Sequence, residues 1–539
     1  MSEPVVDHLI IGSGPAAAAA ALAITSGSSA SVMVIDVGES LEPERREALE
    51  QAAQTAPLEW PKATLDYLAA QPVAQMPGEL PEKRLYGSDF PFRDVGQLDG
   101  LHVSKGGNSK IISGAYGGFS SSWGAQVLPF TARTFDGWPV SLAEMGPHYE
   151  AVLAHVPLAA AHDDYTTLFP LFTHPAPLPP LAEQGADVLR RYAANRHAMQ
   201  RRGVTMGEAR LAMRARDCIA CGLCLTGCPY GLIYSASQTF DELVHAGRLS
   251  YRPGLLAFRV GEDADGCFTL AKELRSGRVH RLRSRKVYVA CGGLGSTRLV
   301  QASGRPDVRE IEMQEAVQFV LPMLSSKAHR DPRTYSTFTL NQYSMLVEYG
   351  RPGLDLAQIH LYPYNPAFSD ELPKAVKLSA GLTTAVLRRA TAALGYLPSW
   401  HSPGLRVGFT PVTADDELPA VSLSSASRPD SRRQLVKVLS RMFQVAKRLD
   451  LYPVLPAVRV SGPGKSYHYG GSFPHVQHAR RGRCETDRQG RLAEWRNIHL
   501  LDGSVFPSVA ATTFTLTVMA NSHRIVSEAL LESHEVRTA

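Results

Sequence analysis

The stretch VVDHLIIGSGPAAAAAALAITSGSSASVMVIDV, residues 5–37, gives the clearest indication of a fold in this chain. It begins with an apolar run at 5–11, continues through a glycine turn into an alanine-rich segment, and reaches a second apolar run at 31–37. Short apolar runs bounded by turn residues are typical of buried strands, and alanine favours a helix. The stretch therefore predicts a strand–helix–strand unit, the repeating element of a doubly wound α/β sheet.

The turn between the first strand and the helix has the spacing G-x-G-x-x-A. The first glycine allows a tight turn, the second lets the backbone approach a pyrophosphate, and the third small residue lets the helix pack closely on the strand. Amide groups at the start of the helix also favour phosphate. Asp36 follows about 20 residues later, where a carboxylate can bind ribose hydroxyls and disfavours NADP. The predicted dinucleotide-binding residues are Gly12, Gly14, Pro15, Ala16, Ala17 and Asp36.

The bulk properties describe an ordinary globular chain. It has 539 residues, of which 44% are hydrophobic and 20% charged, with a net charge of +5. At roughly 150 residues per domain, this length predicts two to four domains. The mild charge, without a basic run interleaved with aromatics, argues against a nucleic-acid partner. We find neither a signal peptide nor a transmembrane segment in the sequence, which predicts a cytoplasmic protein.

Four of the seven cysteines lie in one loop, DCIACGLCLTGCPYG, residues 217–231. Cys218, Cys221, Cys224 and Cys228 follow the spacing C-x2-C-x2-C-x3-C-P of bacterial ferredoxins, which predicts an iron–sulfur cluster. Either Cys228 closes a four-cysteine site, or a remote residue supplies the fourth ligand, so that both a 4Fe-4S and a 3Fe-4S cluster stay open. A tetrahedral zinc site with the same cysteines is the main rival.

Four further segments resemble the glucose–methanol–choline (GMC) oxidoreductases, a family that binds FAD. The closing segment of the family is similar to NIHLLDGSVFPSVAATTFTLTVMANSHRIV (497–526), and its active-site histidine segment is similar to SYHYGGSFP (466–474). A flavin-contacting loop of the pyranose-oxidase branch resembles YGGFSSSWGAQVLPF (116–130), and another FAD-domain segment resembles VYVACGGLGSTRLVQASG (287–304). The resemblance is thin across 305–460.

The resemblance implies a Rossmann-type FAD-binding domain with a second, β-sheet-based substrate domain. It implies that His468 sits over the flavin and takes the proton of the substrate hydroxyl, a task that suits an imidazole. His475 and His478 are nearby rivals for this role. The family usually has Asn or His where Thr513 stands here. Thr513 is therefore the candidate second partner of the substrate hydroxyl, with a shorter reach and a different donor geometry.

The resemblance also implies a set of flavin contacts. Ser122 stands where the pyranose-oxidase branch carries a flavin-linking histidine, so we expect the FAD to be bound non-covalently. Trp123 is expected to help wall the flavin. The implied contacts are Gly118, Ser120, Ser122 and Trp123 in the loop, and Asp502, Gly503 and Phe506 in the closing segment.

These assignments predict a division of the chain. We expect the FAD domain to comprise 1–150, the part at 216–304 that includes the cysteine loop, and 461–539. A helical insertion is expected at 151–215 and the substrate domain at 305–460.

The predicted function is an FAD-dependent dehydrogenase that oxidises an alcohol or sugar hydroxyl. The electrons would pass through an iron–sulfur cluster to an external acceptor such as a ferredoxin, cytochrome or quinone. One alternative is an electron-transfer flavoprotein with FAD and a cluster but no alcohol substrate. Another is a flavin-binding scaffold with a structural zinc loop.

Two segments of the predicted substrate domain complete the interpretation. Residues 374–397, KAVKLSAGLTTAVLRRATAALGYL, have the pattern of one amphipathic helix. Such a helix could lie on a membrane surface or dock an electron acceptor, but a helix that covers the core is the favoured interpretation. His360, with Tyr362, Tyr364 and Phe368, could line a substrate pocket, but an ordinary half-buried strand is the favoured interpretation.

Overall fold

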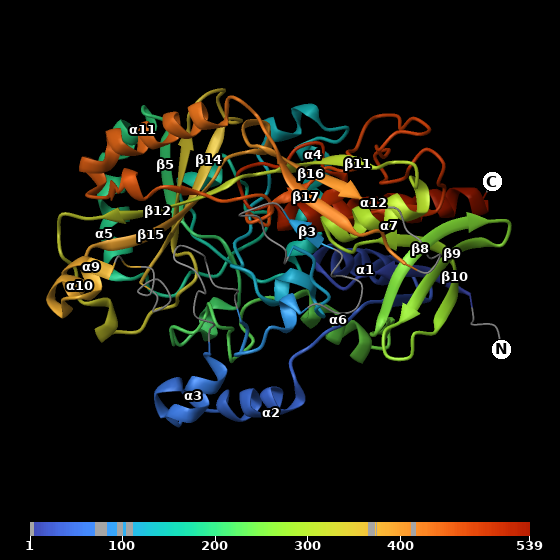
Figure 1. Ribbon diagram of the computed structural model, residues 1–539, viewed down its shortest axis with the longest axis horizontal. Helices are drawn as coiled ribbons and strands as arrows, with labels where there is room; N and C mark the ends of the chain where they lie inside the picture. Colours follow the sequence, from blue (N-terminus) through green and yellow to red (C-terminus); the bar gives the residue numbers. More distant parts are fainter. Residues whose placement is uncertain are drawn as a thin grey trace.

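The chain places a mainly parallel sheet at one end of the molecule and an antiparallel sheet at the other (Figure 1). The computed structural model describes residues 5–70, 84–93, 101–103, 111–364, 372, 374–410 and 417–538. Phe368, a candidate for the substrate pocket, lies outside the residues that the structure describes. The predicted α/β class, with a Rossmann-type domain and a second β-sheet domain, is confirmed.

The strand–helix–strand unit at the N-terminus forms the centre of the parallel sheet. β1 (Val6–Ile11) lies between β2 (Val32–Ile35) and β10 (Val279–Val289), and pairs parallel with both. The carboxyl ends of these three strands therefore meet at one edge, where open α/β sheets bind their ligands. The other strands of this sheet are β7 (Ser250–Arg252), β8 (Leu255–Asp263), β9 (Gly266–Glu273) and β21 (Ile498–Leu500).

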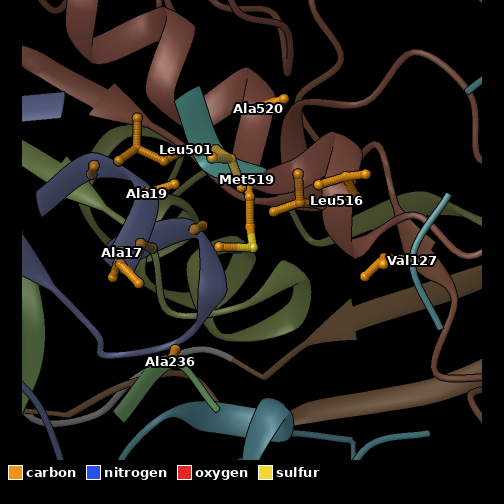
Figure 2. Packing of buried hydrophobic residues seen from close by; sticks show 14 of the residues in the cluster. Ala17, Ala19, Val127, Ala236, Leu501, Leu516, Met519 and Ala520 are labelled. Atoms are coloured by element: carbon orange, nitrogen blue, oxygen red, sulfur yellow. The ribbon is translucent and has the colours of Figure 1, made fainter. Parts of the chain in front are cut away.

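The alanine-rich segment forms α1 (Pro15–Gly27), which is buried from residue 16 to 25. It packs against the C-terminal helix α12 (Thr515–Thr538). Figure 2 shows the Met519 side chain of α12 beside the part of α1 that carries Ala17 and Ala19. Because alanine side chains are short, they let two helices approach closely, and the first and last helices of the chain share one core.

The second sheet is antiparallel, in the order β18–β12–β15–β14–β13–β5 with β19 paired to β12. The helices α5 (Glu183–Gln200) and α11 (Ser431–Leu449) share a core with its apolar side chains. Its strands are β5 (Val204–Glu208), β12 (Gln318–Leu324), β13 (Tyr343–Glu348), β14 (Leu356–Tyr362), β15 (Ala390–Tyr396), β18 (Tyr452–Pro453) and β19 (Arg459–Val460).

A third sheet, in the order β20–β11–β16–β17–β3, connects the two ends of the molecule. Its inward side chains, among them Met313 and Val407, belong to the same core as α1 and α12. Part of the predicted substrate segment 305–460 therefore packs with the Rossmann-type domain. The strands are β3 (Leu101–Val103), β11 (Glu310–Glu315), β16 (Gly404–Phe409), β17 (Val421–Ala426) and β20 (Tyr469–Gly470).

Two segments differ from the sequence-based expectation. Residues 374–397 do not form one helix: α9 (Lys374–Lys377) and α10 (Ala380–Leu387) are followed by the strand β15. The predicted helical insertion 151–215 contains α5, but it also supplies β5, which pairs with β13 of the second sheet. Within the described ranges, no helix combines the length and the apolar character needed to cross a bilayer.

Candidate active site

One cavity of about 960 Å³ runs from the carboxyl edge of the parallel sheet to the face of the second sheet. Its wall includes the residues that follow β1, β2 and β10, and side chains of β14 and β15. Most of the residues predicted from the sequence line it. They are Gly12, Gly14, Pro15, Ala16, Asp36, Gly118, Ser120, Ser122, Trp123, His468, Asp502, Gly503 and Thr513.

At the end of the cavity next to the start of α1, glycines let backbone segments pack more closely than any side chain would allow. Gly12 has a φ of +103°, and a Cβ there would lie 2.5 Å from the carbonyl oxygen of Ala290. Gly118 brings the loop 116–130 against the same turn, since its own Cβ would lie 3.2 Å from the Cα of Gly14. The two glycines thus allow the turn after β1, the segment after β10 and the loop 116–130 to meet at the start of α1. The N-terminus of this helix favours a phosphate.

Asp36 lies at the same end, directly after β2. Its carboxylate accepts hydrogen bonds from the hydroxyls of Ser13 and, at 3.4 Å, Tyr251. Burial raises the pKa of Asp36 to about 7, because a carboxylate loses its hydration in the interior. A ribose diol would supply two further donors to this carboxylate, so the site fits the ribose of a dinucleotide.

At the other end of the cavity, aromatic rings fix the imidazole of His468. The ring stacks on Tyr396 with centroids 4.5 Å apart and meets the edge of Phe514 at 5.2 Å. Its Nδ1 atom is buried and has no hydrogen-bond partner among the described residues. Burial lowers the pKa of His468 to about 4, so the imidazole is neutral at pH 7 and able to accept a proton.

The backbone around His468 is held by a buried carboxylate on β11. Glu315 Oε1 accepts hydrogen bonds from the amide of Gly464 and the hydroxyl of Ser466, each at 2.9 Å. The Ser466 hydroxyl oxygen in turn accepts a hydrogen bond of 3.1 Å from the His468 amide. Tyr467, between them, has a φ of +56°, a left-handed conformation that is strained for a tyrosine. Glu315 thus holds a bent segment that presents the imidazole to the cavity.

Further polar groups that lack partners lie around His468. His360 Nε2 and Thr513 Oγ1 are buried, line the same cavity, and have no hydrogen-bond partner in the described part of the chain. The Thr513 amide donates to Gln358 Oε1 at 3.2 Å, which links the closing segment to β14. Unpartnered buried polar atoms are costly, so several of them around one cavity indicate that a ligand normally binds there.

His360 lines the cavity, although an ordinary half-buried strand was the favoured interpretation of its sequence. Gln358 and His360 alternate along β14 with Ile359 and Leu361, which belong to the core beneath α5 and α11. Side chains alternate between the two faces of a strand, so His360 faces the cavity. Burial lowers the pKa of His360 to about 3, and repulsion from the protonated form of the nearby His468 adds to this shift.

Two predicted cofactor residues and one rival histidine lie elsewhere. Ala17 is fully buried in the core, where it packs rather than lines the cavity. Phe506 is also outside the cavity wall, and its ring contacts Trp138 at 4.7 Å and Phe130 at 5.8 Å. His475 is buried outside the cavity wall, and both of its ring nitrogens have partners: Nδ1 lies 2.7 Å from the Asp487 carbonyl oxygen and Nε2 3.2 Å from the Asn521 amide.

The cysteine loop is bent as its glycines predict. Gly222 and Gly227 have φ values of +83° and +111°, and a Cβ at Gly227 would collide with the ring of Tyr86. Tyr86 also donates to the Cys228 carbonyl at 2.8 Å. Backbone amides donate to two of the sulfurs: Ala220 to Cys218 at 3.4 Å and Thr339 to Cys224 at 3.3 Å.

The structure does not support the predicted iron–sulfur or zinc site. In the part of the chain that is described, which includes all four cysteines, no group of three or more His, Cys, Asp or Glu side chains is placed to hold a metal ion. In the metal-free chain, burial raises the pKa of Cys221 to about 11 and also raises that of Cys218 and Cys224, because a thiolate loses its hydration in the interior. The residues therefore do not fit a preformed metal centre.

A smaller cavity of about 220 Å³ lies between this loop and the main cavity. Cys224 and Cys228 line it on one side. Ser120, Ser122 and Trp123 line both cavities, so the wall between them is one residue thick in places.

Comparison with known proteins shows the fold of the chain. The structure matches that of a pyridoxine 4-oxidase from Mesorbium loti with a TM-score of 0.62 and 12% sequence identity, over 98% of this chain and 99% of that one. At this identity, the match shows a shared fold. No protein-family model matches the sequence, and neither does any curated protein.

Proposed function

We propose that the protein is an FAD-dependent oxidoreductase of the GMC type that oxidises the hydroxyl of an alcohol or sugar. One observation carries the proposal. A single cavity connects the Gly12–Gly14 turn and Asp36, which suit a dinucleotide, to an aromatic-braced imidazole at His468. FAD bound in this cavity would supply a hydride acceptor, and the rest of the chemistry belongs to the side chains.

In this proposal His468 is the general base. A neutral imidazole in a buried site can take the hydroxyl proton as the C–H bond breaks, which contributes roughly 10²–10⁴-fold to the rate of such reactions. Its Nδ1, which has no hydrogen-bond partner among the described residues, supports this role, and its lowered pKa keeps the imidazole unprotonated at neutral pH.

His360 and Thr513 are proposed to orient the hydroxyl. Both carry a buried polar atom without a partner among the described residues. Either can bind the substrate oxygen while His468 takes its proton, because a neutral imidazole and a hydroxyl can each donate one hydrogen bond. His360 would thus share the task for which the family usually provides Asn or His at the position of Thr513.

Anaerobic mixing with substrate tests the proposal. The purified protein is expected to carry FAD, and one or more members of a panel of alcohols and sugars should bleach its visible absorbance. Methyl ethers of the same compounds are the matched control, because they keep the carbon skeleton and lack the hydroxyl proton. A colourless protein that does not take up FAD would contradict the proposal. A bound flavin that no alcohol reduces would favour the electron-transfer flavoprotein.

The electron acceptor is a separate part of the proposal. We favour a dehydrogenase with an external acceptor, a ferredoxin, cytochrome or quinone, because the cysteine spacing is that of a redox loop and a second cavity adjoins the flavin side. The described cysteines do not fit a preformed cluster, so we assign no reaction step to one.

The metal content of the purified protein tests whether the cysteine loop binds iron, zinc or neither. Iron with acid-labile sulfide, in protein purified without oxygen, would support the cluster. Zinc alone would support the structural loop of the scaffold alternative. Absence of both metals would leave the loop as four thiols and would exclude a cluster as the route to the acceptor.

A further inference from the structure

The helix α11 carries an unusual concentration of positive charge. Its 19 residues include six Lys or Arg and no Asp or Glu, a net charge of +6. The whole chain has a net charge of +5, so all its other residues together sum to −1. The cations are Arg432, Arg433, Lys437, Arg441, Lys447 and Arg448.

These cations lie on the side of α11 that faces away from the protein. The buried side chains of the helix, including Val438, Met442 and Val445, pack on the core of the second sheet. Five of the six cations are exposed, and Arg441 is partly so. Arg201 and Arg202, both exposed, continue the charge next to the helix, since Arg441 donates to the Arg202 carbonyl at 2.7 Å. We call these eight residues the basic face.

The charges of the basic face are not neutralised by neighbouring carboxylates. None of the eight residues forms an ion pair within the described residues. Asp187 on α5 pairs instead with Arg190 and Arg191. Two aspartates flank α11, and the carboxylates of both accept hydrogen bonds from other groups. Asp430 accepts one from the Gln434 side chain, and Asp450 accepts one from each of the amides of Ser326 and Lys327.

Two large apolar side chains project from the middle of the basic face. Val436 is 64% exposed and Phe443 is 59% exposed. They are seven residues apart, two helical turns, so they lie on one line of the helix surface, and Lys447 lies next to it. A surface that combines unpaired cations with protruding apolar groups is typical of helices that bind at the interface of an anionic membrane.

We propose that the basic face docks the protein onto an anionic phospholipid surface. The cations would attract the headgroups, while Phe443 and Val436 would insert between them. A second copy of this chain fits poorly, because a two-fold interface would set the same cations against each other. An acidic protein fits less well than a lipid surface, since Phe443 and Val436 protrude among unpaired cations, the arrangement of helices that insert into an anionic interface.

The geometry separates docking from catalysis. Ile359 and Leu361 of β14 face the core under α11, whereas His360 and Tyr362 face the active-site cavity. The sheet thus lies between the membrane-facing helix and the cavity. Docking would leave the cavity accessible, and substitutions on the basic face should not change flavin reduction. This inference does not depend on the proposed reaction.

Vesicle binding by the full-length protein tests the proposal. The protein is expected to co-sediment with vesicles of phosphatidylcholine plus phosphatidylglycerol and not with phosphatidylcholine alone. The charge-reversal variant R433E/K437E/K447E should bind the anionic vesicles at least ten-fold more weakly. The matched control R275E/R278E/R481E makes the same change in net charge at exposed sites outside the basic face, and should bind like the unaltered protein.

Two further measurements sharpen the result. In the F443W variant, tryptophan fluorescence should shift to the blue on adding anionic vesicles, because the indole enters the interface. Salt at about 1 M, where the Debye length is about 3 Å, should release most of the protein. Failure to bind anionic vesicles would overturn the proposal, as would equal losses in the two triple variants. Binding to an acidic protein without binding to vesicles would overturn it in favour of a protein partner.

Discussion

Replacing His468 with alanine is expected to slow flavin reduction by the substrate alcohol by about 10²–10⁴-fold, the usual contribution of a positioned general base. The cavity keeps its nucleotide end in this variant, because Gly12, Gly14 and Asp36 are untouched. The flavin content should therefore stay near that of the unaltered protein. Rapid mixing under anaerobic conditions, followed by the decay of the flavin absorbance, measures the step directly.

The dependence on pH gives a second signature of the same residue. Burial holds the pKa of His468 at about 4, below its ordinary value of 6.5, and only the neutral imidazole can accept the proton. The rate of flavin reduction in the unaltered protein should thus be level near neutral pH and should fall as the pH drops through about 4–5. In H468A this fall should disappear, because the titrating base is gone.

Histidine 478 provides the matched control, since it lies ten residues away in the same region and is exposed. The H478A variant should reduce its flavin as fast as the unaltered protein. A similar loss in H478A, or a full rate in H468A, would show that the base has been assigned to the wrong residue.

The Rossmann-type part of the fold could be predicted because local signals and tertiary packing agree there. The apolar runs at 5–11 and 31–37 are β1 and β2, and the alanine-rich run is α1. Alanine has the highest helix propensity, and its short side chain lets α1 be buried on all sides between β1 and α12. The glycine spacing then places the turn at the sheet edge where the cavity lies.

The segment 390–396 shows where local signals fail. Its sequence, ATAALGY, is rich in good helix formers, yet it forms β15 between β12 and β14. The backbone hydrogen bonds with two neighbouring strands outweigh a propensity worth a few tenths of a kcal/mol per residue. Tyr396, which stacks on His468, was predicted as part of a helix for the same reason.

The residues of the candidate site also differ in whether the sequence alone could identify them. His468 and the glycine turn lie in continuous motifs, so the sequence alone could single them out as candidates, and both line the cavity. Glu315 lies 151 residues before Ser466, and no motif connects the two. His360 was obscured because every residue of β14 is buried, which hides the alternation between the core face and the cavity face. Contacts between distant segments bring these residues to the site.

Glu315 is expected to matter almost as much as His468, although it does not line the cavity and acts as a positioning residue. The E315A variant removes the acceptor of two hydrogen bonds, from the Gly464 amide and the Ser466 hydroxyl. A buried donor without an acceptor costs about 1–3 kcal/mol, so the segment that carries His468 should lose its fixed position. We expect flavin reduction to slow by about 10–100-fold, with a smaller change in substrate affinity, because 1.36 kcal/mol corresponds to a factor of ten.

The E315Q variant separates positioning from general destabilisation. Its amide oxygen can still accept both hydrogen bonds, so flavin reduction should remain within about three-fold of the unaltered rate. Burial raises the pKa of Glu315 to about 7, above its unfolded value of 4.5. The folded state therefore favours the protonated acid, and its stability falls as the pH rises from 4.5 through 7, by about 3 kcal/mol at 1.36 kcal/mol per pKa unit.

Glutamine cannot ionise, so E315Q should escape this loss. Its melting temperature relative to the unaltered protein should rise as the pH is raised from 5 to about 8, whereas E315A should melt lower throughout. Equal rates in E315A and E315Q would show that the carboxylate does not position the base. A slow E315Q that melts as expected would instead indicate that the charge or the second carboxyl oxygen of Glu315 acts on the reaction, since the amide oxygen can keep both hydrogen bonds.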